Sequence, residues 1–370
     1  MRPILQIWHL DPKKPTFTFC ISPVRKSAFI LFFIVLAVQS IHAGNTYRVR
    51  ILKEEFVFTQ PPFKQCHAPT LIETSGGRLI AACFGGDHEG SPDVCIWSSR
   101  LENGQWQAPV QLSCGNTSTG ISNPCWNPVF FKPSDSSLFL YYKTGRSPRE
   151  WDGQRIVSKD EGKSWSSPVA LKEILGPAKN KPLITNGGAW LLPSSKETPD
   201  RWQVFIERSA DHGMSWNIIP VDTSNKAKVI QPALLTDAEG RIHALCRSDQ
   251  DCIMESISSD EGKTWGPLIR TSLPNPNSGF DALTLNTGIH MVVYNPGKKG
   301  KDWWNGRNKL IIAVSSDTKT WTDIYTLEDK AEGEFSYPAL IQTKDGVIHI
   351  LYTYNRVNIR HVALKLELAD

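Results

Sequence analysis

The sequence lacks the features that mark several large classes of protein. Its 41 basic and 37 acidic side chains leave a formal net charge of only +4, and the longest basic run is Lys298-Lys299 with Lys301 nearby. A nucleic-acid-binding surface needs clustered positive charge, so we expect no nucleic-acid partner. Neither a C-x-x-C nor an H-x-x-x-H pattern occurs. Because structural zinc sites use such spacings, we expect no metal site, and no cofactor either.

Cysteine is too scarce for a disulfide-dense scaffold. Of the eight cysteines, Cys20 falls in the N-terminal leader, which leaves an odd number. An odd count argues against a complete disulfide framework. Cys83 and Cys95 lie in apolar strand patterns, and we interpret both as small core residues. Cys246 and Cys252 could pair across a short loop.

No apolar run is long enough to cross a bilayer comfortably, since crossing takes roughly 20 residues. A basic pair at positions 25 and 26 precedes the apolar run 28–38, and small residues follow as far as Ala43. This is the order of a secretory signal. We therefore predict that residues 1–43 are a signal peptide with a long polar lead.

The mature chain, residues 44–370, contains no linker or low-complexity segment and is expected to be one domain. A signal peptide predicts a secreted or periplasmic protein. Association with a membrane is expected only if the N-terminal segment is not cleaved.

A repeat is the strongest feature that is present. The pattern S-x-D-x-G-x-[ST]-W begins at Ser158, Ser209 and Ser258, a version without the glycine begins at Ser315, and Ser99 opens a segment that keeps only the Ser and the Trp. Asp and Ser side chains hydrogen-bond the backbone of tight turns, and glycine adopts the positive φ that such turns need. Each unit, called an Asp box, is therefore expected to join two antiparallel strands.

The spacing of the repeat predicts the fold. Successive units begin 59, 51, 49 and 57 residues apart, which suits one four-stranded propeller blade. Short strand patterns flank the boxes, and no convincing amphipathic helix occurs in the mature chain. We predict an all-β, six-bladed β-propeller with Asp-box turns. The strand at 47–51 is expected to pair with the last strand, at 359–364, and so complete the closing blade.

The boxes and the segments between them resemble the BNR/Asp-box proteins of the sialidase (neuraminidase) superfamily, within its divergent sialidase-like subgroup. The resemblance covers almost everything after residue 55. It implies a glycosidase in which three arginines grip a carboxylate, a Tyr–Glu pair is the nucleophile and an Asp is the acid/base. Tyr337, in the segment Phe335-Ser-Tyr337-Pro, matches the tyrosine, and Arg247 and Arg307 match the second and third arginines.

Two positions depart from that pattern. The place of the first arginine reads His67-Ala68-Pro69, and the glutamate that pairs with the tyrosine is replaced by Gln231. Arginines hold a carboxylate through charge-assisted hydrogen bonds, whereas histidine is a conditional cation near neutral pH. Glutamine cannot take a proton from a phenol, so Tyr337 lacks its activating base.

The segment 84–93 is the densest group of acidic residues, and the resemblance places the acid/base on a mobile loop here. Its spacing does not choose among Asp87, Glu89 and Asp93, although we place Asp93 and Glu89 ahead of Asp87. A protonated carboxyl at this point could donate to a leaving-group oxygen. The alternative is a polar loop in which Asp93 caps the entry to a strand.

Other candidates carry a structural alternative as well. His67 could act as a general acid or base, or be a structural histidine bonded to a neighbouring strand. Arg146 and Arg149, with Trp151, could form a platform for a carboxylate and a sugar ring, or a solvated loop. Asn277 could bond sugar hydroxyls, or hold a turn.

Three functions remain open. The first is a secreted, exo-acting, sialidase-like glycoside hydrolase for sialic acid or another carboxylated sugar. The second is a polysaccharide lyase or unusual glycosidase for acidic glycans, in which His67 transfers the proton and Tyr337 assists. The third is a glycan-binding propeller without catalysis, which the changes at His67 and Gln231 would suit. All three predict a carbohydrate partner, and none fixes an oligomeric state.

Overall fold

The described part of the chain is built from strands and turns. A computed structural model describes residues 47–116, 122–134, 136–224, 226–302 and 304–369, and none of these residues is helical. That part therefore contains no helix that could cross a membrane. The predicted signal peptide, residues 1–43, lies outside the described residues.

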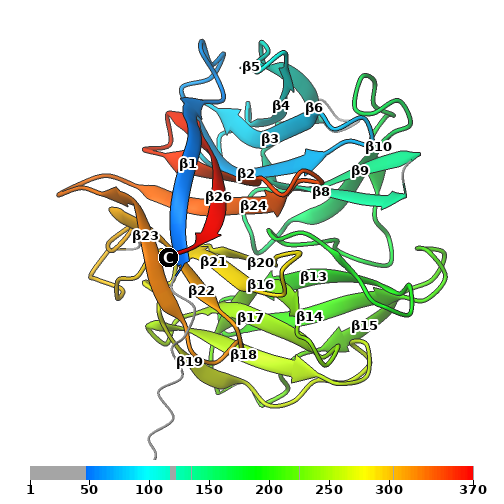
Figure 1. Ribbon diagram of the computed structural model, residues 1–370. Helices are drawn as coiled ribbons and strands as arrows, with labels where there is room; N and C mark the ends of the chain where they lie inside the picture. Colours follow the sequence, from blue (N-terminus) through cyan, green and yellow to red (C-terminus); the bar gives the residue numbers. More distant parts are fainter. Residues whose placement is uncertain (1–46, 117–121, 135, 225, 303, 370) are drawn as a thin grey trace, which may run out of the picture. The chain divides into compact units, whose positions relative to one another are not determined.

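The strands of the described ranges form six antiparallel sheets (Figure 1). The first blade contains β2 (Gln65–Glu73), β3 (Leu79–Gly86), β4 (Cys95–Glu102), β5 (Gln105–Trp106), β6 (Val110–Asn116) and β7 (Ser122–Asn123). The second contains β8 (Cys125–Ser134), β9 (Ser137–Thr144), β10 (Asp152–Ser158) and β11 (Val169–Ala170). The third contains β12 (Leu183–Ile184), β13 (Trp190–Glu197), β14 (Trp202–Ser209) and β15 (Asn217–Pro220).

The remaining three blades follow the same plan. The fourth contains β16 (Val229–Thr236), β17 (Ile242–Ser248), β18 (Cys252–Ser258) and β19 (Ile269–Pro274). The fifth contains β20 (Asp281–Thr284), β21 (His290–Tyr294), β22 (Lys309–Ser315) and β23 (Thr322–Asp329). The sixth contains β24 (Phe335–Gln342), β25 (Ile348–Tyr354), β26 (Asn358–Leu368) and β1 (Tyr47–Phe56).

The six sheets surround one axis. The strand β2 contacts both β8 and β24, and β20 contacts both β16 and β24, so the first strands of neighbouring blades adjoin one another. The core is made of the apolar layers between blades, such as the cluster that joins Phe84 and Ile96 to Phe130 and Ile156. The predicted all-β, six-bladed propeller is confirmed.

The ring is closed by the two ends of the described chain. The strand β1 pairs antiparallel with β26, in a register that runs from Tyr47 opposite Leu368 to Phe56 opposite Arg360. Figure 1 shows this pair as the blue strand beside the red one. The pairing confirms the predicted closure, in which the first strand completes the last blade.

The Asp boxes form the turns between the third and fourth strands of their blades. In the box after β10, Ser158 Oγ donates to Asp160 Oδ1 at 2.8 Å and accepts from the Gly162 amide at 2.8 Å. The Asp160 carboxylate accepts in turn from the Ser164 amide at 2.9 Å. The next two boxes repeat these bonds. Because each box satisfies its own polar groups, it specifies a hairpin by local chemistry alone.

The first strands of four blades share an unusual backbone feature. The register slips at a residue with positive φ that precedes a proline: Ala68 (50°), Asn127 (37°), Gln231 (53°) and Tyr337 (52°). Proline has no N–H to donate, so it fits the unpaired position of a bulge. Backbone strain of this kind is concentrated at functional sites in proteins.

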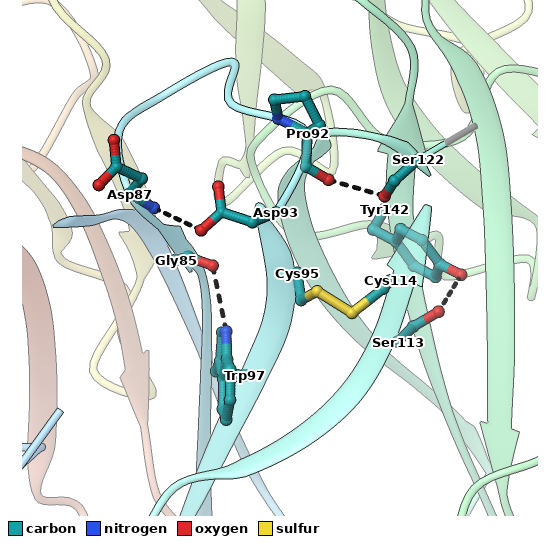
Figure 2. The surroundings of a disulfide bond; sticks show 10 residues. All are labelled: Gly85, Asp87, Pro92, Asp93, Cys95, Trp97, Ser113, Cys114, Ser122 and Tyr142. Carbon is teal, nitrogen blue, oxygen red and sulfur yellow. Dashed lines mark hydrogen bonds between the residues drawn. A yellow bond between two sulfur atoms is a disulfide. The ribbon is translucent and has the colours of Figure 1, made fainter. Parts of the chain in front are cut away.

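One disulfide corrects the cysteine interpretation. Cys95 and Cys114 face each other across β4 and β6 and are bonded, as Figure 2 shows. Cys95 is therefore a disulfide residue rather than an ordinary core residue. The sequence interpretation missed this because the spacing of the cysteines along the chain does not show that β4 pairs with β6. Cys246 and Cys252 are both free and buried, so the alternative pairing is wrong, while Cys83 is free and buried as predicted.

Candidate active site

One structural position recurs in every blade and faces a single cavity. The connection from the second to the third strand, with the residues at its borders, supplies a lining side chain in each blade: Glu89, Pro148 and Trp151, Glu197, Arg247, Arg307 and Arg356. The first strands add the remaining lining residues, which are Trp126, Asn127, Gln231 and Tyr337. The cavity has a volume of about 340 Å³. Equivalent positions converge because the blades share one fold around one axis.

Tyr337 is the central group of this cavity. Arg247 Nη1 donates to the Tyr337 hydroxyl oxygen at 2.6 Å and to Gln231 Oε1 at 3.1 Å. Gln231 Nε2 completes the triangle by donating to the same hydroxyl over 3.4 Å. Both contacts donate to the tyrosine oxygen, so neither accepts the phenol proton.

The connection between β19 and β20, which leads from the fourth blade into the fifth, orients two of the arginines. Asn277 Oδ1 accepts from Arg247 Nε at 2.8 Å, and the Asn277 carbonyl accepts from Arg307 Nη2 at 3.5 Å. Gly279 lies against the Tyr337 ring, because a Cβ added there would be 3.0 Å from that ring. The predicted residue Asn277 therefore belongs to the site, where its side chain holds an arginine.

Arg356 is a third cation in the cavity, and sequence reasoning missed it. It bonds Glu334 through Nε at 2.7 Å and Glu89 through Nη1 at 2.6 Å. Glu334 also pairs with Arg307 at 2.9 Å, so one carboxylate joins the arginines of two blades. Burial alone would raise the pKa of Glu334, but the charges of Arg356 and Arg307 hold it below its ordinary value. The Arg356 carbonyl accepts from the Cys66 amide at 2.7 Å, which ties this turn to the first blade.

His67 lies behind Tyr337 rather than in the lining of the 340 Å³ cavity. Its side chain is buried, and its ring is 4.2 Å from the Tyr337 ring, centroid to centroid. Within the described residues, His67 Nδ1 has no hydrogen-bond partner. Burial, and then the positive charge of Arg356 and other nearby cations, holds the pKa of His67 well below its ordinary value. The imidazole is therefore neutral at neutral pH, and it does not replace the missing arginine as a charge.

The loop between β3 and β4 separates the three acidic candidates. Glu89 reaches the cavity, where it pairs with Arg356. Asp93 Oδ2 accepts from the Asp87 backbone amide at 2.9 Å, as Figure 2 shows, and Asp93 does not line the cavity. Asp87 pairs with Lys64, and that bond lowers the pKa of Asp87. The structure thus brings Glu89 into the site and uses Asp93 to close the loop.

The loop between β9 and β10 supplies apolar surface. Arg146 and Arg149 are exposed there and do not line the cavity, whereas Trp151 does. The Trp151 ring meets the Trp126 ring edge to face, with 6.3 Å between centroids. Aromatic faces of this kind suit the apolar surface of a sugar ring.

A buried lysine, Lys179, has its Nζ over the Tyr337 ring, 5.9 Å from the ring centroid. Lys179 Nζ donates to Asn180 Oδ1 at 2.9 Å, to the Phe280 carbonyl at 2.9 Å and to the Pro338 carbonyl. Burial lowers the pKa of Lys179 to about 7. Because Pro338 follows Tyr337, this lysine helps to hold the strained backbone of the tyrosine in place.

Sequence reasoning missed several residues of the site, among them Trp126, Asn127, Glu197, Glu334 and Arg356. Asn127 could have been identified because it directly precedes a proline on the first strand of its blade, as Gln231 and Tyr337 do. Glu197 and Arg356 could have been identified because they lie in or beside the connection between the second and third strands of their blades, as Arg247 and Arg307 do. Glu334 has no such signal. No group of three or more His, Cys, Asp or Glu side chains in the described ranges is arranged to hold a metal ion.

Comparison of the sequence with known proteins identifies related chains. A profile of the BNR repeat-like domain matches residues 77–350. An anhydrosialidase from Macrobdella decora is 26% identical over 251 residues, and the match covers 59% of this chain. It covers 32% of the anhydrosialidase, so this chain spans about a third of the length of that relative.

Solved structures share the fold at low sequence identity. A protein of unknown function from Dyadobacter fermentans has a TM-score of 0.70 at 16% identity, covering 86% of this chain and 99% of its own. The Hadza microbial sialidase Hz136 has a TM-score of 0.68 at 18% identity, covering 82% of this chain and 66% of its own. Both comparisons support the propeller architecture.

Proposed function

The chain belongs to the BNR repeat-like domain family, within the sialidase superfamily, and we propose that it is a secreted, exo-acting glycoside hydrolase for sialic acid or another carboxylated sugar. The observation that carries this proposal is the 2.6 Å contact between Arg247 and the Tyr337 hydroxyl. It sets a carboxylate-binding cation beside the residue that the family resemblance places at the anomeric carbon.

Three arginines support recognition of a carboxylate. Arg247, Arg307 and Arg356 line the cavity from three consecutive blades. Arg356 supplies a third guanidinium, which is already paired with Glu89 and Glu334, whereas the neutral His67 supplies no charge. Guanidinium groups bind carboxylates through paired, charge-assisted hydrogen bonds, so an acidic sugar suits this wall better than a neutral one.

The rest of the cavity supports binding of a terminal sugar. Trp126, Trp151 and Pro148 come from the second blade, across the ring from the fifth-blade arginine Arg307. A carboxylate held by the arginines would direct the sugar ring toward these apolar faces. The volume of about 340 Å³ is at the small end for ligand pockets, which favours one terminal unit over a length of polymer.

Secretion is the second part of the proposal. The Cys95–Cys114 disulfide suits an oxidising compartment, where such bonds form and persist. The apolar run 28–38, with its basic and small flanks, has the order of a signal peptide. Detection of a mature chain that begins near Gly44 in the culture medium would support secretion, and retention of the full chain inside the cell would contradict it.

The test of activity is a screen of purified protein against sialosides and uronate glycans, with products identified by mass. Arg247→Ala is expected to lower kcat/KM on the order of 10²-fold, because it removes a charged contact to the substrate. Tyr337→Phe should also lower turnover. Arg100→Ala, on the outer part of the first blade, is the control and should leave turnover unchanged. Full activity in both site variants would overturn the proposal.

One observation favours a second candidate function, a glycan-binding propeller without catalysis. Gln231 donates to the Tyr337 hydroxyl and cannot activate it. Tight binding of acidic sugars with no product from any glycan in the same screen would establish this candidate. An unsaturated product that absorbs in the ultraviolet would instead indicate a lyase, in which the neutral His67 takes the proton.

A further inference from the structure

Glu197 is a lining residue of the cavity whose role neither the fold nor the family resemblance assigns. It is the last residue of β13, where the second strand of the third blade meets the connection to the third strand. Arg247 lies near the corresponding border in the fourth blade, whereas Arg307 lies at the other end of this connection in the fifth blade, just before β22. Glu197 therefore shares one cavity with Arg247, Gln231 and Tyr337.

The acidic groups near this cavity differ in their partners. Glu89 is paired with Arg356, and Glu334 is paired with two arginines. Asp93 accepts a backbone hydrogen bond that closes its own loop. Within the described ranges, the Glu197 carboxyl is the one group among these four with no hydrogen bond or ion pair. A partly buried carboxyl in that state remains available to a ligand.

The surroundings of Glu197 and Glu334 shift the pKa values of the two carboxyl groups in opposite directions. Burial raises the pKa of Glu197, although Arg247 and Arg149 act against that change. The pKa of Glu334 is lowered, because the nearby arginines outweigh its burial. When two carboxyl groups of one site are shifted in opposite directions, the group with the raised pKa is the better proton donor.

We propose that Glu197 is the acid/base group of the reaction, an inference that rests on the proposed glycosidase function. The Glu197 carboxylic acid gives its proton to the glycosidic oxygen as the bond from that oxygen to the anomeric carbon breaks. The aglycone leaves as an alcohol, and the positive charge remains on the sugar. Water then adds to the anomeric carbon and gives one proton to the Glu197 carboxylate, which restores the acid.

The position of Glu197 is compatible with the other groups of the cavity. Arg247 and Gln231 both direct N–H groups at the Tyr337 oxygen, so neither of these two side chains supplies the proton for the leaving group. The Glu89 carboxyl is already occupied by its ion pair with Arg356. Glu197 enters from the third blade, between the aromatic residues of the second and the arginines of the fourth to sixth blades.

The test compares leaving groups. Glu197→Gln is expected to slow hydrolysis of a glycoside with a sugar or alkyl alcohol as leaving group by about 10²–10⁴-fold. It should slow hydrolysis of an aryl glycoside by less than about 10-fold, because an acidic phenol leaves without protonation. The alkaline limb of the kcat profile should also flatten. Glu239→Gln, at an exposed position in the turn between β16 and β17, is the matched control and should keep full activity.

The outcomes separate this inference from the proposed function. Wild-type hydrolysis with an unaffected Glu197→Gln variant, or with equal losses on both leaving groups, would overturn the role of Glu197 and leave the glycosidase proposal standing. No hydrolysis by the wild type would overturn both. Rescue of a Glu197→Ala variant by added formate would support the inference, even if the Gln variant folded poorly, and failure of formate to rescue a folded Ala variant would count against it.

Discussion

The Gln231 side-chain amide donates to the Tyr337 hydroxyl oxygen over 3.4 Å. Its orientation is fixed by Arg247, because a guanidinium can only donate and therefore selects the amide oxygen, at 3.1 Å. The NH₂ group is left to face the tyrosine. A glutamate at the same position would present an acceptor to the phenol, so this one substitution reverses the direction of the hydrogen bond.

Restoring the acceptor should therefore restore a base. We expect Gln231→Glu to raise turnover of the best substrate in the glycan screen on the order of 10²-fold, because the new carboxylate can accept the Tyr337 proton. The measurement is kcat on that substrate for the wild type, Gln231→Glu and Gln231→Ala. Turnover by the Glu variant that is no higher than that of the Ala variant would show that Tyr337 needs no base.

Acid should weaken the closing blade. His349 Nδ1 and His361 Nε2 are 3.0 Å apart, and this contact needs one donor and one acceptor. Burial, and then the charge of His361, lowers the pKa of His349 to about 4 from its ordinary value near 6.5. In the unfolded chain His349 therefore binds a proton below about pH 6.5, whereas in the folded protein it binds one only below about pH 4.

Because the folded state holds fewer protons in that window, its stability is complete above the window and falls as the pH drops through it. The expected loss at the acid end is about 3 kcal/mol from this residue. Urea unfolding at several pH values should show it, and His349→Gln should reduce the loss. An identical pH dependence in the variant would contradict the assignment to His349.

Two glycines with the same backbone angle test what the Asp box contributes. Gly162 and Gly240 both have a φ of 79°, but a Cβ on Gly162 would lie 2.2 Å from Ile80 Cδ1, whereas the nearest atom to one on Gly240 is 3.7 Å away. We expect Gly240→Ala to cost roughly 1–2 kcal/mol of unfolding free energy, for the left-handed conformation alone.

Gly162→Ala should cost about 1–3 kcal/mol more, because the added methyl group must displace the packed Ile80. Denaturant midpoints at constant m-value measure both costs. Equal destabilisation of the two variants would mean that Ile80 moves aside freely and that only the backbone conformation matters.

The disulfide should stabilise the first blade. Cys95 and Cys114 are 19 residues apart, so their bond closes a short loop in the unfolded chain. Replacing both with serine should lower the unfolding free energy by about 3 kcal/mol. The double variant should also become insensitive to reductant, while the wild type with reductant approaches it. A wild type that reductant does not affect would contradict this expectation.

The sequence by itself determined the architecture. The Asp boxes are specified by hydrogen bonds within a few residues, such as those joining Ser158, Asp160 and Gly162. Their spacing along the chain indicates the number of blades. The strand at 47–51 precedes the first blade, so it remains to pair with the free edge of the last strand. Local bonding and a period in residue number are properties that a linear sequence displays, and so the propeller and its closure were predictable.

Only the tertiary structure decided the composition of the site. Arg356 and Glu89 pair although 267 residues separate them in the chain, and Glu334 joins Arg356 to Arg307. No spacing in the chain predicts those contacts, because they arise where six separate sheets meet at one axis. The direction of the Gln231 amide and the burial of His67 follow from the same convergence, since each depends on neighbours that other blades supply.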